Sequence, residues 1–205
     1  ADKTRYASII HSETIRLTRL LDDLLDLSVL ENGQVTLYPT SGRLSDVLNR
    51  ALSSALAGQA TPIRVVRDPS AEDVALHTDL DRLVQVFINL VTNAHKYCVA
   101  DVPALTIRVS RDAEMLNIDF VDNGAGLDAD ARAVIFEKFS RVAGQDGDGA
   151  GLGLAICREV MVRLGGGIEY LPGQTGTGFR VRLPSQAVVP VDEKEQVSGG
   201  VSAGS

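Results

Sequence analysis

The sequence is poor in cysteine and has no long apolar run, and each deficit excludes a class of protein. Its two cysteines, Cys98 and Cys157, are too few and too far apart for a zinc site or a disulfide scaffold. We expect both to be buried, reduced thiols, as in a cytosolic protein. No run of about 18 apolar residues and no signal peptide are recognisable. We therefore expect a cytoplasmic chain that does not itself contact the membrane. This expectation leaves open that the longer parent protein is attached to the inner membrane.

Basic residues are outnumbered as well. Lysine and arginine number 20 against 27 aspartates and glutamates, which gives a formal net charge of −7. This charge disfavours nucleic acid as a partner, because its phosphates would be repelled. Apolar residues make up 44% of the chain, which is enough for a proper core. A chain of 205 residues can hold one α/β domain and an appendage.

Residues 1–33 are predicted to form a separate unit, one long helix. Their apolar residues follow a heptad pattern typical of helices that pack against other helices. The two seams of this pattern consist of Ile10, Leu17 and Leu24, and of Leu20 and Leu27. A single helix cannot bury such a stripe alone, so we predict a helical bundle formed by dimerisation. Gly33 is expected to end the helix as a C-cap.

Residues 34–184 are predicted to be one α/β domain. Apolar patterns predict strands at 34–38, 63–66, 74–77, 105–110, 115–121, 168–171 and 179–183. Helical spacing predicts helices at 44–57, 130–139 and 152–164, and one that follows Thr78 as N-cap and ends with the stretch 85–97. Residues 185–205 lose apolar periodicity and become rich in Gly and Ser, which predicts a disordered tail.

The helix through residues 85–97 has a core stripe and a polar face. Asn89 and Asn93 are four residues apart on the polar face, so their amide groups lie one above the other. Neutral oxygen ligands suit Mg²⁺, which also bridges to substrate phosphates. Lys96 lies one turn further along and adds a positive charge. The alternative interpretation is a surface helix with two solvated asparagines.

A first glycine motif, D-N-G-A-G, comes directly after a predicted strand. Its Asp122 can accept a hydrogen bond from an exocyclic amine, and its glycines let a flat ring approach the backbone. By itself the motif is weak, since turns often contain Asp and Gly.

A second glycine motif, G-A-G-L-G-L, leads into a predicted helix. Its glycines expose backbone N–H groups at the positive end of that helix, which suits phosphates. Residues 140–150 are polar and without periodicity, and we interpret them as a mobile lid. Neither the dinucleotide-binding fingerprint nor the G-x-x-x-x-G-K-[ST] motif is present.

Four motifs now stand in a fixed order: N-L-V-T-N-A-H-K-Y, D-N-G-A-G, F-E-K-F and G-A-G-L-G-L. They resemble the N, G1, F and G2 boxes of sensor histidine kinases. The segment L-D-D-L-L-D-L-S-V-L-E-N-G is similar to the second helix of that family's dimerisation domain. The resemblance covers about residues 7–184. It implies the α+β class: a two-layer α/β sandwich, with helices on one face of a mixed sheet, preceded by a long helix of a dimeric bundle.

The resemblance also implies a site for ATP and Mg²⁺. Asn89 and Asn93 would hold the metal, and Asn89 and Lys96 would be catalytic. Asp122 would recognise the adenine amino group. The other residues that the resemblance implies in nucleotide binding are Tyr97, Gly124, Gly126, Lys138, Arg141, Gly149, Gly151, Leu152 and Gly153.

The implied function is donation of the ATP γ-phosphoryl group to a histidine of the dimerisation domain, for relay to a response-regulator aspartate. The implied partners are a second copy of the chain and a receiver domain. The family's acceptor histidine lies in an H-[ED]-x-x-[TN]-P segment, which is absent here, and no proline bends the helix after His11. We therefore expect ATP-binding machinery without the acceptor histidine, a kinase truncated inside its dimerisation domain.

Other functions stay open at this stage. Loss of the asparagine pair or of a glycine box would favour a degenerate, non-catalytic dimerisation or phosphotransfer scaffold, and all of these motifs are intact. A gyrase- or Hsp90-like ATPase would carry a glutamate in place of Asn89. A plain α/β domain with incidental glycines is the remaining alternative.

Overall fold

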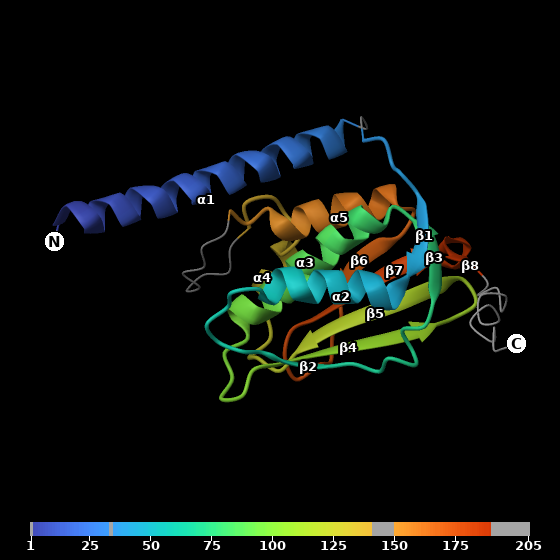
Figure 1. Ribbon diagram of the computed structural model, residues 1–205. Helices are drawn as coiled ribbons and strands as arrows, with labels where there is room; N and C mark the ends of the chain where they lie inside the picture. The colour runs from blue at the N-terminus through green and yellow to red at the C-terminus, as the bar shows by residue number, and fades with distance from the viewer. Residues whose placement is uncertain (1, 33–34, 141–149, 190–205) are drawn as a thin grey trace, which may run out of the picture.

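The computed structural model describes residues 2–32, 35–140 and 150–189 (Figure 1). Its helices are α1 (Asp2–Glu31), α2 (Leu44–Leu56), α3 (Leu80–Tyr97), α4 (Ala129–Val134), α5 (Gly153–Arg163) and the 3₁₀ turn η1 (Ser185–Ala187). Its strands are β1 (Thr40–Arg43), β2 (Arg64–Val66), β3 (Ala75–Thr78), β4 (Ala104–Arg111), β5 (Met115–Asp122), β6 (Gly167–Tyr170), β7 (Gly178–Pro184) and β8 (Val188–Val189). Most of the predicted elements end within one residue of these bounds.

Five strands form one mixed sheet in the order β2-β4-β5-β7-β6. Strand β2 runs parallel to β4, and the other neighbours are antiparallel. The β4–β5 hairpin pairs Leu105 with Asp122, and β5 then pairs Val121 with Gly178 of β7. This register puts Asp122 at the end of a central strand, beside the turn that enters β7.

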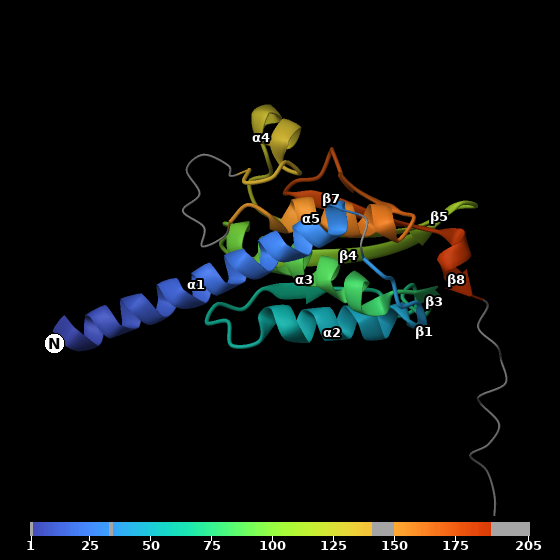
Figure 2. The same cartoon turned by 90° about the horizontal axis from the view of Figure 1, so that it is seen from above.

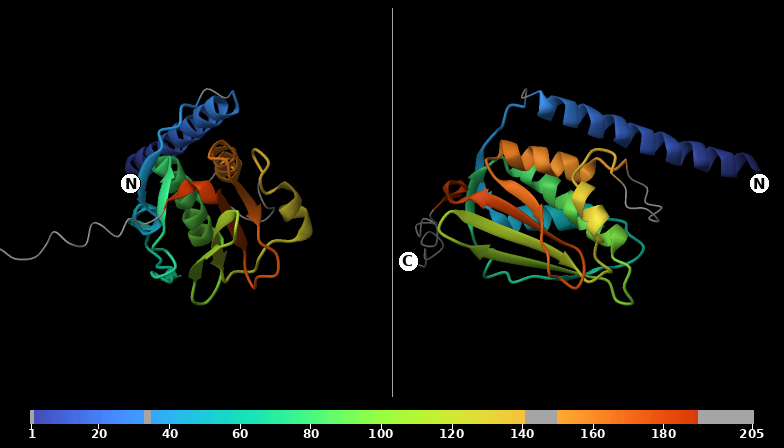
Figure 3. Two further views of the ribbon diagram at one scale, coloured as in Figure 1. Left: turned by 90° about the vertical axis from the view of Figure 1, so that its right-hand side faces the viewer. Right: turned by 180° about the vertical axis from the view of Figure 1, so that it is seen from behind.

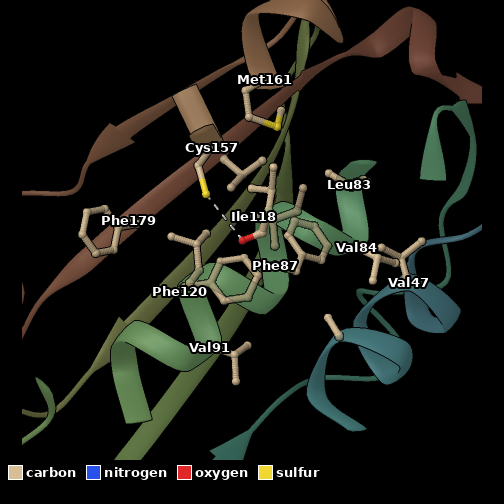
Figure 4. Close-up of a cluster of buried hydrophobic side chains, with 14 of the residues drawn as sticks. Val47, Leu83, Val84, Phe87, Val91, Ile118, Phe120, Cys157, Met161 and Phe179 are labelled. Atoms are coloured by element: carbon tan, nitrogen blue, oxygen red, sulfur yellow. Dashed lines mark hydrogen bonds between the residues drawn. The ribbon is translucent and has the colours of Figure 1, made fainter. Parts of the chain in front are cut away.

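Helices α2, α3 and α5 cover one face of this sheet (Figures 1 and 3). Helix α3 lies between the other two, and its buried residues recur at helical spacing. Phe87 of α3 packs on Phe120 of β5, with ring centroids 5.0 Å apart (Figure 4). The predicted fold class, helices on one face of a mixed sheet with a long helix in front, is confirmed.

A second, three-stranded sheet has the order β1-β3-β8. In it β8 pairs with β3, Leu76 opposite Val188 and Ala75 opposite Val189. The chain is therefore ordered through residues 185–189, and the predicted start of a disordered tail at 185 is wrong. A two-residue strand is too short for a periodic pattern, and its place depends on pairing with β3. Residues 190–205 lie outside the described part of the chain.

The strand predicted at 34–38 is also wrong. Residues 35–39 have no regular structure, and β1 begins at Thr40. Val35 and Leu37 alternate with polar residues, as in a strand, because both side chains are half-buried against the core. The segment does not pair with a neighbouring strand. The predicted end of the first helix at Gly33 lies outside the described residues.

Two helix boundaries differ from the predictions. Asp79, not Thr78, caps α3, because Thr78 is already paired as the last residue of β3. The Asp79 carboxylate accepts the N–H of Arg82 over 3.1 Å. The helix predicted at 130–139 is α4 and ends at Val134. Beyond it, Phe136 packs edge-on against Phe179, with ring centroids 6.0 Å apart, and Phe139 has a φ of 59°, which a continuing helix does not allow.

Helix α1 lies along α5, and its N-terminal part projects past the rest of the fold (Figures 1 and 2). Near its C-terminal end, Leu27 and Leu30 are buried in the common core. The Arg163 guanidinium donates to the Leu30 carbonyl over 2.6 Å, and Gln85 donates to Asp26 over 3.0 Å. One end of the predicted heptad stripe is therefore buried within the chain itself. No described helix meets the length and apolarity needed to cross a bilayer.

Candidate functional site

A cavity of about 270 Å³ opens between α3, the start of α5 and the end of β5. Nine of the residues predicted to bind a nucleotide line it: Asn89, Asn93, Lys96, Tyr97, Asp122, Gly126, Gly151, Leu152 and Gly153. The fold thus brings two amides, an ammonium group, a carboxylate and a helix N-terminus to one place. Their individual roles stay predictions.

Helix α3 supplies the amide side of the cavity. Leu83, Phe87 and Leu90 hold its opposite side in the core, so the polar face turns toward α5. Asn89 and Asn93 are half-buried on that face. The Asn89 amide group lies 3.4 Å from the Gly153 carbonyl oxygen and donates to it, which ties α3 to the first residue of α5.

The start of α5 supplies N–H groups without intrahelical partners. The first turn of any α-helix leaves such donors free and carries partial positive charge, which favours an anion. Gly151, just before α5, has a φ of 71°, a left-handed conformation that favours glycine. A Cβ at Gly151 would be 2.6 Å from the Ser140 carbonyl oxygen, so only glycine lets the two segments pass this closely.

Asp122 supplies the carboxylate, and it is only 8% exposed. Its Oδ1 accepts the N–H of Gly124 over 2.8 Å and the N–H of Thr177 over 3.0 Å. Two backbone donors on one oxygen fix the orientation of the carboxylate plane. Gly126 follows with a φ of 77° and lines the cavity without a side chain. A flat ring carrying an amine fits this carboxylate and glycine surface.

Four of the predicted ligands are not among the described lining residues. The Gly124 N–H donates a hydrogen bond to Asp122 Oδ1, so Gly124 contacts the carboxylate and not the cavity. Lys138 forms an ion pair with Glu31 of α1 at 2.5 Å, and its contact with phosphates stays a prediction. Arg141 and Gly149 lie outside the described residues.

Among the lining residues that the sequence analysis did not predict are Thr177 and Asp23. Thr177 belongs to the turn 171–177 that leads into β7, where the T-G-T-G segment was the available signal. Asp23 lies on α1. Only the docking of α1 along α5 brings Asp23 to the cavity, so no local signal could have found it.

Both cysteines are free and buried, as expected. Burial raises the pKa of the Cys157 thiol to about 12, and a hydrogen bond with Asn89 acts in the other direction. Cys157 therefore stays an uncharged thiol behind the asparagine face.

No group of three or more His, Cys, Asp or Glu side chains in the described residues could hold a metal ion. A divalent cation at this cavity would depend on amide oxygens, water and the phosphates of a ligand. That donor set fits Mg²⁺, which keeps several waters and is rarely held by a complete protein cage.

A mixed sheet with three helices on one face, and a cavity lined by amides, a carboxylate and glycine loops, defines the histidine kinase-like class of ATP-binding domains. The family model described as "Histidine kinase-, DNA gyrase B-, and HSP90-like ATPase" matches residues 78–187. The chain belongs to this family, and the predicted resemblance is confirmed.

Among its relatives are named sensor proteins. The chain is 34% identical to the sensor protein KdpD of Escherichia coli over 192 residues, which cover 92% of this chain and 21% of that protein. It is 32% identical to the sensor protein VanS of Enterococcus faecium over 193 residues, which cover 89% of this chain and 48% of that protein. The chain thus spans less than half the length of either relative.

Solved structures of histidine kinases share the fold. The Acinetobacter baumannii histidine kinase AdeS superposes with a TM-score of 0.68 at 23% identity, over 87% of this chain and 83% of that one. ShkA, whose structure holds AMPPNP, superposes with a TM-score of 0.68 at 26% identity, over 89% of this chain and 38% of that one.

Proposed function

We propose that this chain binds ATP with Mg²⁺ and donates the γ-phosphoryl group to a histidine of a dimerisation domain in a cytoplasmic two-component system. The observation that carries the proposal is the single cavity that joins the α3 asparagines, the N-terminus of α5 and Asp122. Phosphoryl transfer depends mostly on positioning and charge neutralisation, and this set of groups supplies both on the donor side.

Each group has a role within the proposal. The Asp122 carboxylate accepts a hydrogen bond from the adenine amine. The N–H groups at the start of α5 bind phosphate oxygens. Asn89 and Asn93 hold Mg²⁺ through their amide oxygens, and Lys96 contributes positive charge at the same surface. The ion would neutralise charge on the phosphate groups when bound.

Transfer is favoured over hydrolysis by the chemistry of Asn89. An amide cannot take a proton from water, whereas a carboxylate at this position could act as a general base. We propose as acceptor, in place of water, a histidine on a bundle helix, from which the phosphoryl group then passes to a receiver-domain aspartate. The proposed partners are a second copy of the chain, through α1, and the receiver domain.

Titration calorimetry with ATP, with and without Mg²⁺, tests the donor side. We expect Asn93→Ala to weaken Mg²⁺-dependent binding by about tenfold, the effect of losing roughly one charge-assisted contact. Asn49→Ala is the matched control, because Asn49 pairs with Arg67 on the exposed side of α2. Unchanged affinity and unchanged Mg²⁺ response in Asn93→Ala would contradict the assignment.

A further inference from the structure

Gly176 lies in the turn between β6 and β7, directly against Asp122. A Cβ at this position would be 2.2 Å from the Asp122 carbonyl oxygen, 2.5 Å from Asp122 Oδ1 and 2.7 Å from the Gly124 nitrogen. Two of these three atoms are backbone atoms, so no change of rotamer relieves the crowding. The φ of Gly176 is outside the left-handed region. Space, and not backbone conformation, therefore requires glycine here.

This close approach makes the hydrogen bonds that orient Asp122. The Asp122 N–H donates to the Thr177 carbonyl oxygen over 3.0 Å, and the Thr177 N–H donates to Asp122 Oδ1 over 3.0 Å. With the Gly124 N–H at 2.8 Å, Oδ1 has two donors. Within the described residues Oδ2 has no hydrogen-bond partner, and Asp122 lines the cavity. Oδ2 is thus the acceptor left for a ligand.

We infer that Gly176 is a positioning residue for recognition of a 6-aminopurine: by admitting the turn against Asp122, it holds the carboxylate with Oδ2 toward the exocyclic amine. The inference rests on the proposed function, because the ligand is the base of the bound nucleotide. Any side chain at 176 moves the turn away from Asp122 and removes the Thr177 N–H from Oδ1. The carboxylate then loses its fixed orientation, and the amine loses a well-placed acceptor.

The test compares ATP with purine riboside 5′-triphosphate, which lacks the 6-amino group. By calorimetry with Mg²⁺, we expect the native chain to prefer ATP by about tenfold, the effect of one hydrogen bond to a charged group. We expect Gly176→Ala to lose most of this preference while its affinity for the purine analogue changes little. The double variant Gly176→Ala/Asp122→Asn should lose no more preference than Asp122→Asn alone, because both changes act on one acceptor.

Gly167→Ala is the matched control, because a Cβ at Gly167 would meet no atom within 4 Å and its φ is outside the left-handed region. It should keep the full preference for ATP. An equal loss of affinity for both ligands in Gly176→Ala would assign the residue a purely structural role and overturn the inference. A native chain that binds neither ligand would instead refute the proposed function.

A second variant serves if Gly176→Ala does not fold. Replacing the Thr177 residue by its α-hydroxy analogue exchanges the amide N–H for an ester oxygen and adds no atom at 176. We expect this ester variant to lose the preference for ATP as Asp122→Asn does. A retained preference would show that the Thr177 N–H does not orient the carboxylate, and would overturn the inference.

Discussion

Cys157 and Asn89 lie on neighbouring helices, the thiol in the core and the amide at its edge. Cys157 is fully buried and donates a long hydrogen bond to the Val86 carbonyl oxygen over 3.8 Å (Figure 4). A thiolate there would be desolvated, which is why burial raises the pKa. The Cys157 thiol behind the polar face of α3 is therefore kept uncharged.

The raised pKa of Cys157 predicts a pH dependence of stability. In the unfolded chain the thiol ionises near its ordinary pKa of 9.0, whereas in the folded chain it keeps its proton up to about 12. The folded state binds more protons between these values, so the free energy of unfolding should fall as the pH rises above 9.0. Urea unfolding between about pH 8 and 10.5 measures this fall.

The control is Cys157→Ala, in which the unfolding free energy should fall less steeply with pH than in the native chain. This variant should be less stable at every pH, because the substitution leaves a cavity. Other groups titrate in the same range, so the difference between the two slopes is the quantity of interest. Parallel slopes would show that Cys157 does not cause the fall.

At the scale of secondary structure, helix ends carry much of the site. Asp79 caps α3 and also accepts the Tyr38 N–H over 3.0 Å, which holds the segment after α1 against the asparagine helix. The start of α5 faces the cavity, and Gly151 brings it against Phe139 and Ser140. The start of α5 therefore shapes the cavity together with the middle of α3, which supplies Asn89 and Asn93.

Gly151 and Gly58 form a matched pair for testing this. Both have a φ of 71°, but a Cβ at Gly151 would be 2.6 Å from the Ser140 oxygen, whereas at Gly58 it would meet nothing within 4 Å. Gly58→Ala should cost about 1–2 kcal/mol of unfolding free energy through left-handed strain alone. Gly151→Ala should cost about 1–3 kcal/mol more through overpacking and should weaken ATP binding.

Thermal unfolding and calorimetry on the two variants measure these effects. Equal destabilisation of both variants, with nucleotide affinity unchanged in both, would contradict the role of the Gly151 contact. Loss of affinity in Gly58→Ala as well would point to a general loosening of the fold.

At the scale of the whole molecule, α1 has two different halves. Its C-terminal end is held by Leu27 and Leu30 in the core and by Arg163 and Gln85 through hydrogen bonds. Its N-terminal part projects past the fold (Figure 2). Apolar side chains of this part are exposed, among them Ile10 at 66% and Leu17 at 57%. A single chain leaves this stripe uncovered, which supports the proposed bundle with a second copy.

This arrangement predicts that the chain does not phosphorylate itself. His11 lies on the projecting part of α1 and is exposed. Transfer needs donor and acceptor atoms about 3–3.5 Å apart and in line, and a helix without its bundle partner cannot arrange that. Incubated with ATP and Mg²⁺, the chain should gain little acid-labile phosphate, and His11→Gln should change nothing. Phosphate mapped to His11 by mass spectrometry would contradict this prediction.

The complementary experiment adds a helix that carries an H-[ED]-x-x-[TN]-P segment. The native chain should then label the added histidine, whereas Asn93→Ala should label it far more slowly. Absence of labelling by a native chain that binds ATP would separate a binding module from a kinase.

The elements and motifs that depend on neighbouring residues could be predicted from the amino-acid sequence alone. Helices α2, α3 and α5 and the β4–β5 hairpin follow from apolar periodicity over eight or more residues. Asn89, Asn93 and Asp122 were found because they belong to short motifs with their own chemistry. In each case the signal lies within a few turns of helix or one strand.

Contacts between residues far apart in the chain could be found only in the folded molecule. Asp23 reaches the cavity only because α1 docks along α5, and Lys138 pairs with Glu31 for the same reason. Gly176 requires glycine because the strand register brings its turn onto Asp122, and β8 exists only as a partner of β3. Such contacts leave no periodic trace, because docking and register are determined by the packing of the whole core and not by local preference.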